Sequence, residues 1–82
     1  MHQSIINIGS KIGKNVIINS SSLIEHNVVI GDHCHISTGA IINGGVKIGS
    51  ESFIGSGAII KQCITIGKRS VIGAGVVIKT NI

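Results

Sequence analysis

Isoleucine recurs at every sixth position along this chain. The repeat covers thirteen consecutive positions without a gap: Ile6, Ile12, Ile18, Ile24, Ile30, Ile36, Ile42, Ile48, Ile54, Ile60, Ile66, Ile72 and Ile78. A helix repeats its apolar face about every 3.6 residues and a strand about every 2, so neither alone has a period of six. A fixed six-residue period instead predicts stacked coils, with one aliphatic side chain pointing inward per hexad.

A second inward register lies four residues after each isoleucine. Its residues are nearly all small or β-branched: Ser10, Val16, Ser22, Val28, Cys34, Ala40, Val46, Ser52, Ala58, Ile64, Ser70, Val76 and Ile82. Glycine is common directly after isoleucine, and because glycine and asparagine tolerate positive φ, we expect sharp corners there. These positions are Gly13, Gly31, Gly49, Gly55, Gly67, Gly73, Asn7, Asn19 and Asn43. The pattern predicts short flat strands joined by tight corners.

Three hexads make one triangular turn in the predicted solenoid, so residues eighteen apart should stack. The turns are about 6–23, 24–41, 42–59 and 60–77, with 78–82 beginning another. Charges then fall into columns that would favour the stack by a few tenths of a kcal/mol per exposed pair. The columns are His33, Glu51 and Arg69; Lys14, Asp32, Ser50 and Lys68; and Glu25, Asn43 and Lys61. We therefore predict one all-β domain over residues 1–82, a parallel β-helix of about four triangular coils.

The composition favours a small module that associates with copies of itself. Phe53 is the only aromatic residue among the 82, and a narrow prism filled by isoleucine needs no more. A chain this short is marginal alone, so we expect oligomerisation. No apolar run approaches the roughly 18 residues that a membrane span needs. The N-terminus also lacks the basic start and long apolar stretch of a signal peptide.

Cysteine placement and charge indicate the redox compartment and the classes of ligand to expect. Cys34 falls in the inward register and Cys63 in an outward one, so we expect no disulfide, and unpaired thiols suit a reducing cytoplasm. The formal net charge is +4, but the basic residues are spread along the chain. Base-stacking aromatics are absent, which argues against nucleic-acid binding. The charge fits a solvated surface, or the attraction of an anionic cofactor such as coenzyme A.

Five hexads carry a motif that resembles a known family. They begin Ile30-Gly31-Asp32, Ile48-Gly49-Ser50, Ile54-Gly55-Ser56, Ile66-Gly67-Lys68 and Ile72-Gly73-Ala74. These segments resemble the hexapeptide-repeat acyltransferases. The resemblance implies a left-handed parallel β-helix that is usually trimeric. The handedness comes from the resemblance alone, because crossovers in parallel sheets are generally right-handed.

A longer stretch resembles one branch of that family more specifically. Residues 23–40 read LIEHNVVIGDHCHISTGA, and the similarity continues through residues 44–49 to the C-terminus. They resemble acetyltransferases that modify sialic acids or nucleotide-linked amino sugars. The resemblance implies a cytoplasmic homotrimer that transfers acetyl from acetyl-CoA directly to a hydroxyl or amine of a sugar or nucleotide sugar. From the residues themselves we expect no metal and no nucleic-acid or membrane partner.

Two departures from that pattern bear on activity. These enzymes usually carry an N-terminal domain that binds the sugar nucleotide, and no part of this sequence resembles it. They also usually place Asp or Glu directly after the catalytic histidine, where this chain has Asn27. An amide can still orient a ring N–H, but it cannot stabilise imidazolium by charge. We therefore expect the activity to be weakened.

The resemblance also assigns roles to individual residues. His26 would be the general base, and histidine suits that task because its ordinary pKa is about 6.5. Asn27 would orient it. His35 would contact acetyl-CoA near the thioester, and Ser56 and Ala74 match further cofactor-binding positions that should stack along the axis.

The stacking supplies an argument about His26 that does not depend on the family resemblance. Eighteen residues after His26 comes Gly44, followed by Gly45, so no side chain from that turn would cover the imidazole. Two glycines beside a polar histidine should leave an open notch with exposed backbone N–H and C=O groups. Such a notch could admit an acyl group, so we place Gly44 among the cofactor-binding residues.

Two alternatives to an active transferase remain open at this point. A trimeric module or truncated remnant without turnover would account for the missing acceptor domain and for Asn27. A zinc enzyme of the β-helical carbonic anhydrase type shares the fold, but His26, His33 and His35 lack the expected spacing. The sequence leaves the identity of the acceptor open, as well as the choice between O- and N-acetylation.

Overall fold

The repeat forms a series of two-residue strands, each ending on one of the periodic isoleucines. A computed structural model describes residues 5–6 and 8–82, and within them it contains strands and turns but no helix. No segment there could therefore cross a membrane as a helix. The thirteen strands are β1 (Ile5–Ile6), β2 (Lys11–Ile12), β3 (Ile17–Ile18), β4 (Leu23–Ile24), β5 (Val29–Ile30), β6 (His35–Ile36), β7 (Ile41–Ile42), β8 (Lys47–Ile48), β9 (Phe53–Ile54), β10 (Ile59–Ile60), β11 (Thr65–Ile66), β12 (Val71–Ile72) and β13 (Val77–Ile78).

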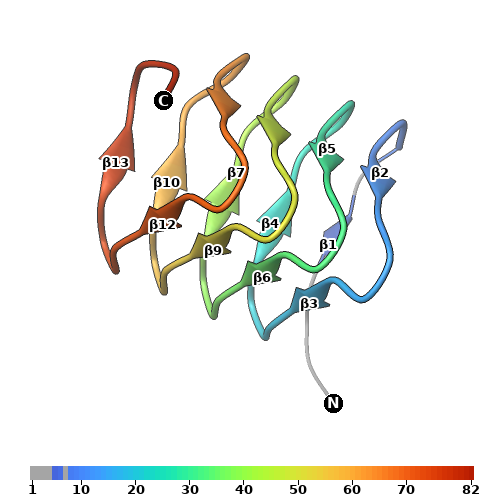
Figure 1. The fold of residues 1–82 in the computed structure, drawn as a ribbon, viewed down its shortest axis with the longest axis horizontal. Coiled ribbons are helices and arrows are strands. Elements are labelled where there is room, and N and C mark those ends of the chain that lie inside the picture. The colour runs from blue at the N-terminus through green and yellow to red at the C-terminus, as the bar shows by residue number, and fades with distance from the viewer. Residues whose placement is uncertain (1–4, 7) are drawn as a thin grey trace.

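The strands assemble into three parallel sheets that form the sides of a prism (Figure 1). Sheet A has the order β1-β4-β7-β10-β13, sheet B is β2-β5-β8-β11, and sheet C is β3-β6-β9-β12. Each strand pairs with the strand eighteen residues further on, as Leu23 does with Ile41. The predicted β-helix and its stacking interval are confirmed.

The two inward registers make the core. The isoleucines of the six-residue repeat from Ile24 to Ile72 are at most 3% exposed, and the second register is buried from Ser22 to Ile64. Polar members of that register are satisfied inside, because Ser22 Oγ donates to Ser37 O at 2.8 Å and Cys34 Sγ donates to Gly49 O at 3.2 Å. Hydrogen-bonded serine thus fills a narrow interior without an orphaned hydroxyl.

The corners correct one prediction. From Ile6 to Ile72, positive φ occurs at the third residue after each periodic isoleucine and not at the first, and seven of these residues are not glycine: Asn15, Ser21, Asn27, His33, Glu51, Cys63 and Arg69. Glycine directly after isoleucine serves close approach instead. A Cβ on Gly31 would lie 2.6 Å from Ser50 N, and one on Gly49 would lie 2.5 Å from Lys68 N. Asn7, placed in the same slot, lies outside the described residues.

The outer faces of the three sheets differ in polarity. The outward residues of sheet A are aliphatic at Leu23, Ile41, Ile59 and Val77. Sheet C presents Ile17, His35, Phe53 and Val71, of which Val71 is 77% exposed. Sheet B presents Lys11, Val29, Lys47 and Thr65. Two adjoining faces of the prism are therefore largely apolar, and the third carries lysines.

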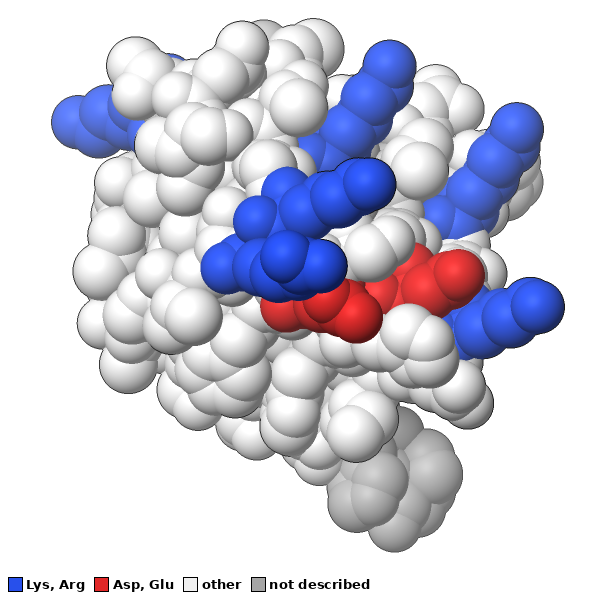
Figure 2. Space-filling view, viewed as in Figure 1, with Lys and Arg blue, Asp and Glu red and all other residues white. Residues whose placement is uncertain are grey.

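The charged columns form partly as predicted. Arg69 Nε donates to Glu51 Oε1 at 2.9 Å, and this hydrogen bond lowers the pKa of the Glu51 carboxyl below its usual value. Asp32 instead accepts from the backbone N of Lys14 at 2.8 Å. In Figure 2 most Lys and Arg side chains project separately, while basic side chains at the centre of the view touch one another and lie against acidic ones. Cys34 is buried and Cys63 exposed, and both are free thiols, as predicted.

Candidate functional site

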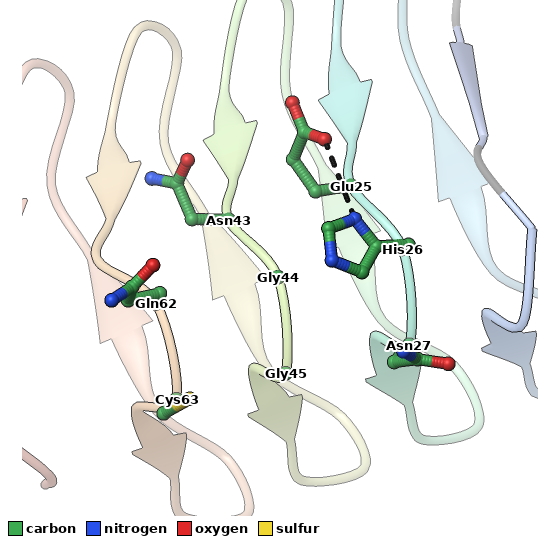
Figure 3. A pocket seen from close by; sticks show the side chains of 8 residues that line it. All are labelled: Glu25, His26, Asn27, Asn43, Gly44, Gly45, Gln62 and Cys63. Carbon is green, nitrogen blue, oxygen red and sulfur yellow. Dashed lines mark ion pairs between the residues drawn. The ribbon is translucent and has the colours of Figure 1, made fainter.

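A hollow of about 450 Å³ lies at the corner between sheets A and B, which we call the A–B corner. The turns after β4, β7 and β10 stack there, because each contributes residues eighteen apart (Figure 3). The residues that line it are Glu25, His26, Asn27, Asn43, Gly44, Gly45, Gln62 and Cys63. The stacking therefore brings His26 and Gly44 together, as predicted from their separation in sequence.

His26 presents one ring nitrogen to the glycine pair. Its side chain is 67% exposed, and Figure 3 shows the ring extending over the turn that contains Gly44. A Cβ built on Gly44 would lie 3.3 Å from His26 Nε2, so any larger residue would press on that nitrogen. Gly45 has a φ of +74°, which favours glycine at the next position as well. The notch expected beside the imidazole is present.

The other ring nitrogen of His26 faces Glu25, which the sequence analysis placed only in a charge column with Asn43 and Lys61. Glu25 Oε1 lies 3.9 Å from His26 Nδ1, and its side chain is 32% exposed (Figure 3). Asn27 is arranged differently. Its φ of 58° turns the amide towards the preceding coil, where Oδ1 occupies the space that a side chain on Gly9 would need. In the structure the ion-pair partner of the imidazole is thus Glu25.

The remaining predicted residues lie elsewhere on the same chain. His35 projects from the outer face of sheet C, with its Nε2 3.0 Å from Asn19 Nδ2 and its ring centroid 5.2 Å from that of Phe53. Ser56 and Ala74 lie on successive coils at the corner between sheets C and A, where Gly75 N donates to Ser56 O at 2.9 Å. A single chain does not bring these three residues to His26.

Polar groups on the far side of the notch were also missed by the sequence analysis. Asn43, Gln62 and Cys63 complete the wall of the hollow, and Cys63 N donates to Gly44 O at 2.9 Å. The eighteen-residue columns through Glu25, His26 and Asn27 contain all of them, so reading each column to its end would have found them. Within residues 5–6 and 8–82, no group of three or more metal-ligating side chains exists.

Comparison with protein families shows to which family this chain belongs. The model for bacterial transferase hexapeptide (six repeats) matches residues 9–44 and again residues 45–80. The chain belongs to the bacterial transferase hexapeptide family. Comparison with curated protein sequences finds no match.

Two solved structures show how closely this hexapeptide-family chain follows known transferases. One is the acetyltransferase domain of PglB from Neisseria gonorrhoeae with acetyl coenzyme A, at 27% identity and a TM-score of 0.80, covering 96% of this chain and 47% of that one. The other is PerB from Caulobacter crescentus with CoA and GDP-perosamine, at 26% identity and a TM-score of 0.71, again covering 96% and 47%. This chain therefore spans about half the length of each.

Proposed function

We propose that this chain is the acyl-transfer module of an acetyltransferase that uses acetyl-CoA and a sugar or nucleotide-sugar acceptor. The observation that carries the proposal is the arrangement of His26, whose Nε2 faces a notch kept open by Gly44 and Gly45. The similar PglB domain binds acetyl coenzyme A, and PerB binds CoA together with GDP-perosamine. Both are consistent with a donor and an acceptor meeting at this corner.

The residues of the hollow fit direct transfer. His26 Nε2 takes the proton from the acceptor hydroxyl or amine while the acceptor oxygen or nitrogen attacks the acyl carbonyl carbon. The backbone N–H of Gly44 would stabilise the carbonyl oxygen as negative charge develops there, whereas the N–H of Gly45 already donates to His26 O at 3.2 Å. The carbon–sulfur bond then breaks, and the imidazolium returns its proton to the departing thiolate. Acetyl-CoA supplies the activated acyl group.

The apolar faces support a trimer. Ile17, Phe53, Val71 and Val77 are each at least 40% exposed in one chain, and they lie on sheets A and C, which share a corner. Packing sheet A of one copy on sheet C of the next would bury both faces. Such a head-to-tail contact forms a closed ring when its rotation closes, and three copies suit a three-sided prism. The lysines of sheet B would then face solvent.

The same packing would complete the site. His26 lies at the edge of sheet A, whereas His35 lies on sheet C, so a contact between these sheets brings His26 of one copy towards His35 of another. Ser56 and Ala74, on the corner next to sheet C, would extend that surface along the axis for the pantetheine arm. Lysines spread over the remaining surface would attract the phosphates of the donor.

A thiol-release assay with acetyl-CoA and a panel of amino sugars and nucleotide sugars tests the proposal. We expect His26→Ala to lower kcat by about 100-fold or more, as loss of a general base does. The matched control is His33→Ala, which removes an exposed histidine at the corner between sheets B and C. An equal rate in parent and His26→Ala would remove the assignment of the base.

A second candidate is a trimeric module without turnover, which is favoured by Asn27 and by the half-length match to PglB and PerB. Calorimetric titration with acetyl-CoA separates the two. An active or impaired transferase binds the donor, whereas a purely structural module has no reason to. Binding without thiol release for any acceptor would indicate that the acceptor site is provided by another part of a longer chain.

A further inference from the structure

We propose that Glu25, and not Asn27, is the positioning residue for the His26 imidazole. The inference rests on the proposed function, because it assigns a role within that site. A general base needs a second group that fixes which ring nitrogen carries the proton and that stabilises the imidazolium once it forms. Glu25 and Asn27, the two neighbours of His26 in the sequence, both have polar side chains. In the structure these side chains point in different directions.

The ring of His26 is held between a carboxylate and the notch. Glu25 Oε1 lies 3.9 Å from Nδ1, and a Cβ on Gly44 would lie 3.3 Å from Nε2 and 3.4 Å from Cε1. A proton on Nδ1 would therefore lie near negative charge, and Nε2 lies beside the notch through which an acceptor would enter. That is the tautomer a base at Nε2 requires.

The backbone fixes Glu25 firmly enough for this role. Its N donates to Ile42 O at 2.9 Å, and its own carbonyl accepts from Ser10 Oγ at 2.7 Å. The carboxylate leaves the corner on the same side as the imidazole (Figure 3). At 3.9 Å the two groups are too far apart for a hydrogen bond, and they form an ion pair only once the imidazole is protonated. Catalytic contacts in unliganded sites commonly shorten when substrate binds.

Asn27 is turned out of reach by the conformation that the corner imposes. The third residue after each isoleucine adopts positive φ throughout the described coils, and Asn27 does so at 58°. Its amide oxygen consequently points at Gly9 in the preceding coil, away from the ring (Figure 3).

Kinetics of the full chain distinguish the two residues. We expect Glu25→Gln to lower kcat roughly tenfold, the effect of losing one unit charge about 4 Å from the imidazolium in a solvated site. The KM for acetyl-CoA should stay within about twofold, since Glu25 acts through His26. Glu25→Asp should retain more activity than Glu25→Gln, because it keeps the charge.

Asn27 supplies the comparison within the same site, and Glu51 supplies the control outside it. Asn27→Ala should change kcat by less than about threefold, and Asn27→Asp should not restore the rate of Glu25→Gln. Glu51→Gln removes a carboxylate paired with Arg69 on another corner and should leave kcat unchanged. A kcat equal to that of the parent in Glu25→Gln, or a larger loss in Asn27→Ala, would overturn the proposal.

A measurement on the resting protein keeps this inference separate from the question of activity. Nitrogen-15 NMR at about pH 8.5, where imidazole is ordinarily neutral, reports which ring nitrogen carries the proton. The His26 signals, assigned by their loss in His26→Ala, should show more Nδ1–H tautomer in the parent than in Glu25→Ala. Equal tautomer populations would sink the Glu25 assignment even in an active enzyme. A difference would support it even if every acceptor fails.

Discussion

Two corners of the prism are built from the same hexad yet serve different ends. At the corner between sheets B and C, the residue after isoleucine is glycine in Gly13, Gly31, Gly49 and Gly67. At the A–B corner the same slot holds Glu25, Asn43 and Lys61. The first corner brings successive coils too close for a Cβ at Gly13, Gly31 and Gly49, whereas the second lets side chains project. The proposed chemistry is therefore assigned to the corner whose backbone leaves room for side chains.

The contrast also explains why the hollow lies where it does. His26 can extend along the axis because Gly44 carries no side chain beneath it, and Glu25 can face it because its slot is not pressed by the next coil. At the corner between sheets B and C, polar residues instead pair with one another, as Arg69 does with Glu51. The A–B corner thus contains a hollow, whereas the corner between sheets B and C carries a surface ion pair.

The largest effect is expected from alanine at the corner between sheets B and C, which we call the tight corner. Gly49→Ala places a Cβ 2.5 Å from Lys68 N, so the coils must separate locally. We expect a loss of about 3 kcal/mol in the free energy of unfolding, the upper part of the usual range for overpacking. Thermal and denaturant unfolding measure it.

The control for that variant is Lys61→Ala. It truncates an exposed side chain that directly follows an isoleucine at the A–B corner, the position that Gly49 holds at the tight corner. It should change stability by less than about 0.5 kcal/mol. Similar losses in the two variants would show that the corners are not mechanically different.

Next in size is the effect of a charge on either side of the A–B corner. Ile59→Lys introduces a cation on sheet A, and we expect association of the proposed trimer to weaken by at least about 100-fold. Val29→Lys makes the same change on the outer face of sheet B and should leave association intact. Light scattering after size-exclusion chromatography gives the masses. Dissociation by Val29→Lys alone would place the interface on sheet B instead.

A smaller effect probes the notch itself. Gly44→Ala would put a methyl group 3.3 Å from His26 Nε2, and we expect kcat/KM to fall about tenfold while the unfolding temperature stays nearly constant. Gly67→Ala is the matched change at the tight corner near the C-terminal end, where the new Cβ would lie 3.4 Å from Ile82 O. It should preserve activity. An unaltered kcat/KM in Gly44→Ala would mean that reacting groups do not approach through the glycine pair.

The smallest effect concerns the surface ion pair at the tight corner. Arg69 holds the pKa of the Glu51 carboxyl below its usual value, so the folded state favours the ionised form. The pair's contribution to stability is present above the unfolded-state pKa of the carboxyl and is lost as pH falls through the lower folded-state value. Unfolding measured from pH 7 to pH 3 should show a slightly shallower acid loss in Glu51→Gln than in the parent. An identical pH dependence would show that the pair contributes nothing.

The sequence alone determined the fold and the stacking interval. Thirteen isoleucines at a strict period leave no other regular structure that buries them all, and the eighteen-residue interval then follows from three sides per coil. That interval was sufficient to place Gly44 beside His26. It worked because the columns depend on counting and not on side-chain conformation.

The tertiary structure decided what counting could not. The assignment of positive φ to the third residue of each corner, and with it the direction of Asn27, depends on how backbone dihedrals divide the bend between neighbouring residues. The approach of Glu25 to His26 depends on the space left by the next coil. Sequence period sets which residues share a corner, but local backbone geometry sets which of their atoms meet.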